Sequence, residues 1–232
     1  MMAERLLWDR YLFQIRVSGL ISDGGKILDI GTGMNTTILE MFGDNFAVTS
    51  SDINVGKWNA HIPDMIEVDA MNIDQSDAAN SKWDAVILSE VLEHVLEPKR
   101  VLSQARNILA PDGVVIITMP FWYRIHEYGD LDPETVEPGL RDYWRITPHG
   151  MEHLLREASY DHFWVGRLVA GDKRTFPEFY CPSGVVAWAK STGSKKIVLV
   201  PEHDWNPPLP EDWRQHQIAM AKRWGDGNVN TE

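Results

Sequence analysis

Cysteine is almost absent from this 232-residue chain, where Cys181 stands alone. A single cysteine excludes an intrachain disulfide and fits a reducing compartment. Long apolar runs are also missing. A membrane-spanning helix needs about 20 apolar residues, and the longest strand-like run here is Val114–Met119. Charged residues interrupt the first ten positions, unlike the apolar segment of a secretory signal. We therefore expect a soluble, cytoplasmic protein.

Basic residues are few as well. The chain has 22 Lys and Arg against 34 Asp and Glu, a formal net charge of −12. This charge disfavours nonspecific attraction to nucleic-acid phosphates, so we expect a small-molecule partner and neither nucleic acid nor membrane. His149 and His153 lie four apart on a predicted helix, but no third ligand accompanies them in a known metal-binding spacing. We expect surface histidines and no metal.

Short β-branched runs alternate with helical segments between residues 26 and 190. This alternation predicts an α/β fold with a parallel sheet covered on both faces. The seven candidate strands are Lys26–Ile30, Phe46–Ser50, Met65–Val68, Trp83–Leu88, Val114–Met119, Phe163–Val169 and Gly184–Ala189. We assign 26–190 to this domain, 1–25 to an N-terminal helical extension, and 191–232 to a C-terminal connector and helix.

Helix signals support this division. Apolar residues recur at helical spacing over 101–109, and Pro111-Asp112-Gly113 then predicts a turn. Thr147 and Pro148 have the character of an N-cap and a first helical residue. The C-terminal helix has an apolar face, which we expect to dock either on its own domain or on a second copy of the chain as a homodimer.

The clearest motif is an apolar strand, Ile27-Leu28-Asp29-Ile30, that runs into Gly31-Thr32-Gly33. A helix-compatible segment, Thr36–Met41, follows it. Glycines suit a sharp turn in which the backbone closely approaches a ligand. The order of strand, turn and helix makes this motif more specific than glycine spacing alone.

Asp52 adds to this signal. It ends the second apolar strand, about 20 residues after Gly31, which is the offset expected for a carboxylate that binds ribose hydroxyls. A carboxylate accepts both hydroxyl protons. The two motifs together predict a nucleoside-containing cofactor.

Taken together, several segments resemble the class I, Rossmann-like S-adenosylmethionine-dependent methyltransferases, and in detail their small-molecule branch. The matching segments are Asp29–Gly33, Ser51–Ile53, Val68–Ala70, Trp83–Val95 and Leu109–Gly113. The resemblance implies a seven-stranded, mostly parallel Rossmann-like sheet with a reversed last strand. It also implies methyl transfer from S-adenosylmethionine to a small-molecule acceptor, with oxygen or nitrogen as the expected acceptor atom.

The resemblance also implies a set of cofactor-binding residues. In the first turn these are Asp29, Gly31, Thr32 and Gly33, the two glycines facing the methionine part of the cofactor. The others are Asp52 at the ribose, Ile53 on the adenine face, Asp69 and Ala70 at the adenine amine, and Ser89 near the amino acid group. One departure from the family pattern is Asn35, which stands where many relatives have a third glycine. Asn tolerates positive φ better than most residues.

Two other functions stay open at this point. An NAD-dependent oxidoreductase would use a Gly-x-Gly-x-x-Gly loop, but position 36 is Thr36 instead of glycine. A nucleoside-binding module without activity is compatible with every residue, and only turnover distinguishes it from an enzyme.

Residues 120–146 form a longer connection than an αβ unit needs, and such segments are often binding loops. The connection is rich in aromatic residues, which can wall a pocket, and in acidic residues. We expect it to form the substrate loop. Candidate bases for a protonated acceptor are His94, after the fourth strand, and His126, in this loop, because imidazole titrates near neutral pH.

Overall fold

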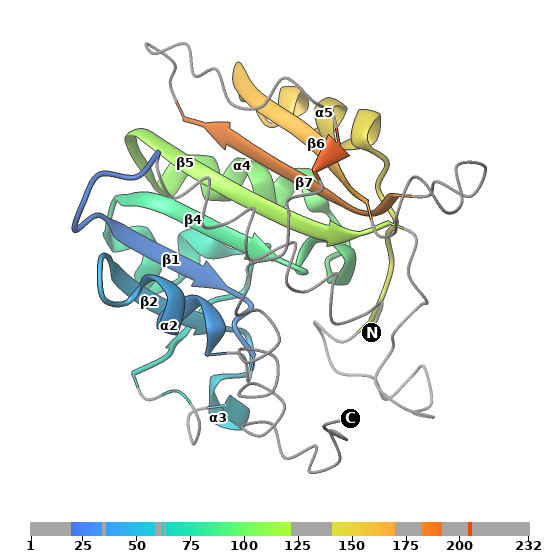
Figure 1. The fold of residues 1–232 in the computed structure, drawn as a ribbon. Coiled ribbons are helices and arrows are strands. Elements are labelled where there is room, and N and C mark those ends of the chain that lie inside the picture. Colours follow the sequence, from blue (N-terminus) through green and yellow to red (C-terminus); the bar gives the residue numbers. More distant parts are fainter. Residues whose placement is uncertain are drawn as a thin grey trace, which may run out of the picture.

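A single mixed sheet organises the protein. The computed structural model describes residues 20–33, 36–58, 62, 64–121, 141–169, 182–191 and 204–205. Within these residues the sheet has eight strands in the order β3-β2-β1-β4-β5-β7-β6-β8 (Figure 1). The strands are β1 (Lys26–Ile30), β2 (Ala47–Asp52), β3 (Ile66–Glu67), β4 (Trp83–Ser89), β5 (Leu109–Pro120), β6 (His162–Val169), β7 (Pro182–Lys190) and β8 (Asp204–Trp205).

The strand directions confirm the predicted architecture. Strands β1 to β5 pair in parallel, whereas β7 runs antiparallel to both β5 and β6. The seven-stranded, mostly parallel Rossmann-like sheet with a reversed seventh strand is therefore observed. The short strand β8, which pairs in parallel with β6, was not predicted. Two residues are too few to show an alternating pattern.

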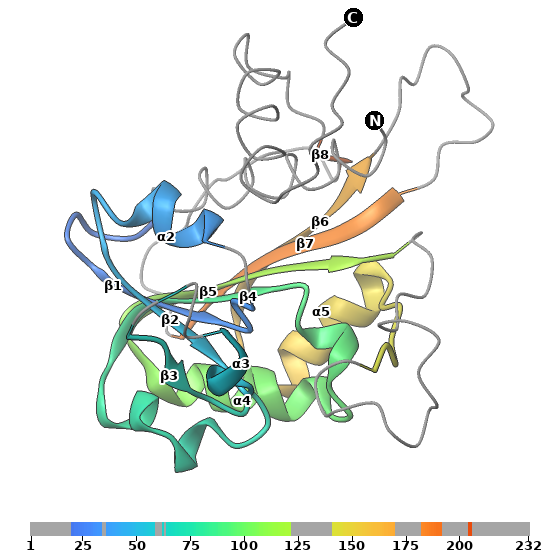
Figure 2. The same cartoon turned by 90° about the horizontal axis from the view of Figure 1, so that it is seen from below.

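Helices cover both faces of the sheet. The α-helices are α2 (Thr37–Phe42), α3 (Val55–Trp58), α4 (Pro98–Ile108) and α5 (Pro148–Glu157), and the 3₁₀ turns are η1 (Ile73–Gln75), η2 (Asp77–Asn80) and η3 (Leu92–His94). Figure 2 shows α2 on one face and α4 and α5 on the other. The predicted helices of the two terminal segments lie mostly outside the described residues.

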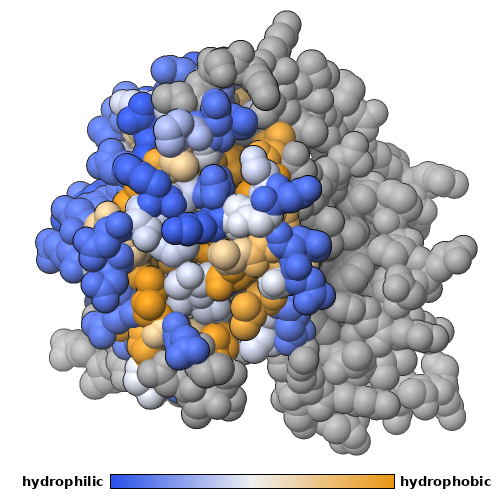
Figure 3. Space-filling model, turned by 90° about the vertical axis from the view of Figure 1, so that its left-hand side faces the viewer, coloured by the Kyte–Doolittle hydropathy of each residue, from blue (hydrophilic) through white to orange (hydrophobic). Residues whose placement is uncertain are grey.

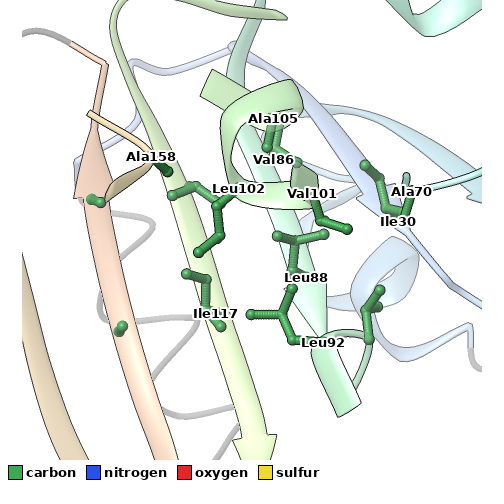
Figure 4. Packing of buried hydrophobic residues seen from close by; sticks show 14 of the residues in the cluster. Ile30, Ala70, Val86, Leu88, Leu92, Val101, Leu102, Ala105, Ile117 and Ala158 are labelled. Carbon is green, nitrogen blue, oxygen red and sulfur yellow. The ribbon is translucent and has the colours of Figure 1, made fainter. Parts of the chain in front are cut away.

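The largest core lies between the sheet and α4. Val101, Leu102 and Ala105 form the buried stripe of this helix and face Leu88 of β4 and Ile117 of β5 (Figure 4). A separate core on the opposite face includes Ile38 and Phe42 of α2 together with Ile27, Ala85 and Ile87. Both faces are therefore buried, and for this reason β4 is a continuous apolar run instead of an alternating one.

The turn predicted at Pro111-Asp112-Gly113 lies inside β5. Trp83 of β4 pairs with Leu109, but Ala85 pairs with Val114, so the register shifts and residues 110–113 bulge out. Asp112 adopts a positive φ of 61° within this bulge. The predicted turn before the strand is therefore a bulge within it, because the strand begins earlier than expected, directly after α4.

The predicted start of α5 is confirmed. The Thr147 hydroxyl accepts a hydrogen bond from the Gly150 N–H at 3.1 Å, and Pro148 occupies the first turn, where its missing N–H is not needed. His149 and His153 are both exposed on this helix, as expected. After the helix, the buried Tyr160 donates its hydroxyl to the Leu102 carbonyl at 3.1 Å and so ties the end of α5 to α4.

The side of the molecule at which β1, β4 and β5 begin is shown in Figure 3. Its described residues alternate between hydrophilic areas and smaller hydrophobic ones. No helix among the described residues is long and apolar enough to cross a membrane. The polar side chains that the sequence singles out lie at the opposite ends of these strands.

Candidate functional site

The site lies where the sheet order reverses. β1 has β2 as its neighbour on one side and β4 on the other, so the connections that follow β1 and β4 lead to opposite sides. Open α/β sheets bind ligands at the carboxyl ends of strands beside such a switch point. Here the loop after β1, the end of β2 and the end of β4 meet.

The loop after β1 needs both of its glycines, for different reasons. Gly31 has φ +75°, and a Cβ there would lie 2.8 Å from Cγ2 of Val91, so any larger residue would clash. Gly33 has φ +58°, but a Cβ there would meet nothing within 4 Å. Gly31 therefore allows the close approach of Val91 to the loop, whereas Gly33 borders open space from which a ligand can approach the backbone.

A buried polar network ties this loop to β2. The backbone N–H groups of Gly31 and Thr32 both donate to the Ser51 carbonyl, at 2.8 and 2.9 Å. The Thr32 hydroxyl lies 2.8 Å from Oδ2 of Asp29, and it accepts a hydrogen bond from the Ser51 N–H at 3.2 Å. The Ser51 hydroxyl donates to the Asp29 carbonyl at 2.9 Å. These bonds fix the direction in which the loop leaves the strand.

Asp29 is 2 % exposed, and its environment changes its acidity. Burial raises the pKa of Asp29 from 3.8 to about 7, the hydrogen bond from Thr32 opposes this shift, and the nearby charge of Asp52 adds to it. The carboxyl group consequently exchanges its proton in the neutral range, and a cation placed beside it would favour the ionised form.

Asp52 and Asp69 follow adjacent strands. Asp52 is 8 % exposed and accepts hydrogen bonds from the N–H groups of Gly33, at 3.0 Å, and Asn54, at 2.9 Å. Asp69 accepts from the Met71 N–H at 2.9 Å and from the side-chain amide of Asn72 at 2.6 Å. A carboxylate has about four acceptor positions, so each carboxylate keeps capacity for ligand hydroxyl or amine groups.

The end of β4 carries a conformation that the sequence does not reveal. Glu90 has φ +57°, a left-handed conformation that is uncommon for residues other than glycine. Two contacts to β5 hold it there: its N–H donates to the Thr118 carbonyl at 2.9 Å, and its Oε1 accepts from the Thr118 hydroxyl at 3.0 Å. Ser89 Oγ lies 3.1 Å from the same hydroxyl. Such held backbone outliers concentrate at functional sites.

The turn η3 contacts the end of the predicted substrate loop. Nδ1 of His94 lies 2.8 Å from the Arg141 carbonyl oxygen, and its Nε2 lies 3.7 Å from Oε1 of Glu93, whose side chain is fully buried. Arg145 forms a two-pronged ion pair with Asp142. The hydrogen bond to Asp142 raises the pKa of Arg145, and the charges of Glu93 and Glu90 act in the same direction.

The structure thus brings most of the predicted residues to one edge of the sheet. Asp29, Gly31, Thr32, Gly33 and Asp52 are joined by the bonds above. Asp69 and Ala70 are connected to Asp52 through the bond from the Val68 N–H to the Asp52 carbonyl, at 3.1 Å, and Ile53 directly follows Asp52. Ser89 and His94 lie on the β4 side. His126 and Asn35 lie outside the described residues.

Three features of the site were not predicted: the Ser51 contacts, the left-handed Glu90, and the docking of residues 141–145 on η3. A charged residue amid the apolar Leu92 and Val95 was a signal for a special role of Glu93. The Ser51 and Glu90 features depend on backbone positions, for which a sequence pattern gives no signal.

Comparisons with known proteins agree with this site. A family model described as a methyltransferase domain matches residues 6–162. The chain is 21% identical over 217 residues to a ubiquinone biosynthesis O-methyltransferase of Haemophilus ducreyi, covering 89% of this chain and 79% of that protein. It is 24% identical over 200 residues to the protein of the same name from Escherichia coli, covering 83% and 70%.

The fold is likewise similar to a solved structure. A SAM-dependent methyltransferase from Archaeoglobus fulgidus matches with a TM-score of 0.56 at 14% identity, covering 78% of this chain and 94% of that one. The matched family covers β1 to β5, and with them the glycine loop and the carboxylates. These findings do not favour the NAD-dependent alternative.

Gly33 and Gly24, which both have positive φ and an open Cβ position, generate a first prediction. Gly33→Ala and Gly24→Ala both place Cβ in open space at positive φ, +58° and +73°. Each should therefore lower the free energy of unfolding by a similar amount, about 1 to 2 kcal/mol. Because Gly24 lies before β1, at the other end of the strand, only Gly33→Ala should weaken cofactor binding, by about tenfold or more.

Calorimetry with S-adenosylhomocysteine, at a temperature where both variants are folded, measures this difference. Equal affinities of the two variants would show that the ligand does not approach the loop at Gly33.

Asp29 generates a second prediction. Because its pKa is 3.8 in the unfolded chain and about 7 in the folded protein, the folded protein binds more protons between these values. Its contribution to the free energy of unfolding therefore falls as the pH rises from 3.8 to about 7. Asp29→Asn removes this dependence, so the variant should gain stability relative to wild type over this range.

Urea unfolding at several pH values between 4.5 and 8 gives the difference, with the exposed Asp161→Asn as the control for loss of one carboxylate. A constant difference between wild type and Asp29→Asn would contradict the assigned shift.

Proposed function

Because the chain belongs to the methyltransferase-domain family and uses S-adenosylmethionine as its methyl donor, we propose that it methylates an oxygen atom of a small-molecule acceptor. The observation that carries the proposal is the family match across the glycine loop and the strand-end carboxylates. The names of the two O-methyltransferase relatives support oxygen as the acceptor atom.

The cofactor residues of this proposal are those on the carboxyl edge of β1, β2, β3 and β4. We assign the methionine part of the cofactor to the space beside Gly33, where a Cβ would meet nothing within 4 Å, and Gly31 and Thr32 hold the loop. Asp52 supplies acceptor positions for the ribose hydroxyls. The remaining proposed contacts are Ile53 and Ala70 on the adenine, Asp69 at its amine, and Ser89 and Asp29 near the amino acid group.

These residues fit the charge of the donor. S-adenosylmethionine, when bound, supplies an electrophilic methyl group on a positively charged sulfur. The charge of Asp52 adds to the rise in the pKa of Asp29, so a cationic group bound beside the two carboxyl groups would be favoured. The Thr32 hydroxyl bonds the side chain of Asp29 and the Ser51 hydroxyl bonds its carbonyl. Asp29 is thus held in place by the protein itself, so the site is preorganised.

On the acceptor side, we propose that the connection of residues 120–146 covers the site and excludes water. Its described end, from Arg141 onward, docks on η3 close to the end of β4. Exclusion of water and alignment of the acceptor are the protein's main contributions to an in-line displacement. His94 and His126 stay the candidate bases for an acceptor hydroxyl, and a different role for His94 is argued below.

Two further proposals concern the location of the protein and its oligomeric state. A cytoplasmic location follows from the sequence expectation and is tested by fractionation. A homodimer through the terminal helices depends on segments outside the described residues and is tested by light scattering of the full chain.

The donor can be tested without knowledge of the acceptor. S-adenosylhomocysteine at 100 times its Kd should raise the Tm by about 5 to 10 °C, because ligand binding stabilises only the folded state. NAD at the same concentration should leave the Tm unchanged. Turnover of methyl-labelled donor with fractionated small molecules, followed by mass spectrometry, should then give an O-methyl product.

The possible outcomes separate the functions. Stabilisation by NAD alone would contradict the donor assignment. Donor binding without transfer to any fraction would favour the inactive nucleoside-binding module, and an N-methyl product would correct the acceptor atom.

The role of Asp52 generates a further prediction. Asp52→Asn should weaken binding of S-adenosylhomocysteine by about 1.5 to 3 kcal/mol, the range for a hydrogen bond to a charged group. The loss should largely vanish for an analogue without the two ribose hydroxyls, since the partner groups are then missing in both proteins. Calorimetry of the four combinations provides the coupling energy. An equal loss for both ligands would indicate that Asp52 acts only through its bonds to Gly33 and Asn54.

A further inference from the structure

The turn η3 and the chain segment 141–145 are joined by three hydrogen bonds. The His94 ring contacts the Arg141 carbonyl at 2.8 Å, the Tyr143 N–H donates to the Glu93 carbonyl at 2.7 Å, and Nε1 of Trp144 donates to the Val95 carbonyl at 2.8 Å. These contacts connect residues that are 47 to 50 positions apart in the sequence. They pin the end of the long connection to the turn that follows β4.

The pinned segment leads directly into a fixed element, α5. Downstream, Thr147 caps α5, which packs on α4 and the sheet. Upstream lies the rest of the proposed acceptor loop. Between them, Arg145 pairs with Asp142 and experiences the charges of Glu93 and Glu90. The position of residues 141–145 relative to the end of β4 therefore depends on the contacts at η3.

The geometry of the His94 ring matches this role. A carbonyl oxygen only accepts hydrogen bonds, so the hydrogen must reside on Nδ1. In the neutral ring the lone pair is then on Nε2, which lies 3.7 Å from the carboxylate of Glu93. The side chain of His94 is 16% exposed and that of Glu93 is fully buried. A hydrogen bond of the ring thus runs from Nδ1 to the Arg141 carbonyl and joins η3 to residue 141, whereas a general base would act through Nε2, and substitutions can separate the two roles.

We infer that His94 is a positioning residue, which holds residues 141–145, the described end of the proposed acceptor loop, on η3 through the bond from Nδ1 to the Arg141 carbonyl. This inference rests on the proposed methyl transfer for its kinetic consequence, because a loosened loop weakens acceptor binding. The structural part, that the bond holds residues 141–145 in place, is independent of the reaction.

A pair of substitutions separates positioning from base catalysis. His94→Asn puts a side-chain amide N–H close to the place of Nδ1–H but has no group that can take up a proton at neutral pH. His94→Ala removes the donor as well. For a positioning residue, the acceptor KM should rise about tenfold in His94→Ala, the effect of one lost hydrogen bond, with kcat within about threefold. His94→Asn should retain a KM close to wild type.

A base gives the opposite pattern. Both variants would then lose roughly 10²- to 10⁴-fold in kcat, and the acidic limb of the pH profile would disappear in both. This result would overturn the inference. An equal rise of KM in both variants would also overturn it, because the amide donor of Asn would then have failed to substitute for the ring. His153→Asn, on the exposed side of α5, serves as the control.

Hydrogen exchange provides a readout that needs no acceptor. The Tyr143 amide, bonded to Glu93, should exchange faster in His94→Ala than in wild type and at the wild-type rate in His94→Asn. Trp144→Phe, which keeps an aromatic ring but removes the donor to Val95, should also accelerate it and covers the case in which His94→Ala does not fold. Unchanged exchange in a folded His94→Ala, or in Trp144→Phe where His94→Ala does not fold, would overturn the inference even if methyl transfer is confirmed. Faster exchange without turnover on any acceptor would uphold the contact and reject the proposed function.

Discussion

One carbonyl group, that of Ser51, determines how the chain leaves the central strand β1. It accepts the N–H groups of both Gly31 and Thr32, and this is possible because Gly31 adopts a left-handed conformation. The same turn brings Thr32 onto the buried Asp29 and Gly33 onto Asp52. The pairing of β1 with β2 therefore determines three features: the open side of the loop at Gly33, the burial of the Asp29 carboxyl group and the placement of the Asp52 carboxylate.

Parallel pairing also explains why several acidic side chains meet at one edge of the sheet. The carboxyl ends of neighbouring parallel strands lie at one edge, so the residues after β1, β2, β3 and β4 are neighbours in space. Repulsion between these groups is relieved either by retention of a proton, as at Asp29, or by backbone donors, as at Asp52 and Asp69. A cationic ligand would relieve it further, which suits the sulfonium group of the donor.

The sequence predicted those parts of the molecule that depend on local pattern. Apolar runs such as that of β4 and the capping residues Thr147 and Pro148 correspond closely to the observed elements, because burial and capping act over a few adjacent residues. The glycine loop followed from the need for positive φ. The bulge in β5 and the left-handed Glu90 depend on register with a neighbouring strand, and the contact between His94 and Arg141 depends on how a long connection returns to the sheet. Such long-range geometry has no signal in a single sequence.

The antiparallel strand β7 has a consequence for how the protein is made. It lies between β5 and β6, although both of these precede it in the chain. While the ribosome is still synthesising the residues before 182, β5 consequently has one unpaired edge, and β6 has no partner through which to join the sheet. An exposed edge of this kind readily pairs with other chains. The nascent chain is thus most prone to misassembly in the interval between emergence of β5 and emergence of β7, and any premature stop in that interval leaves the edge open permanently.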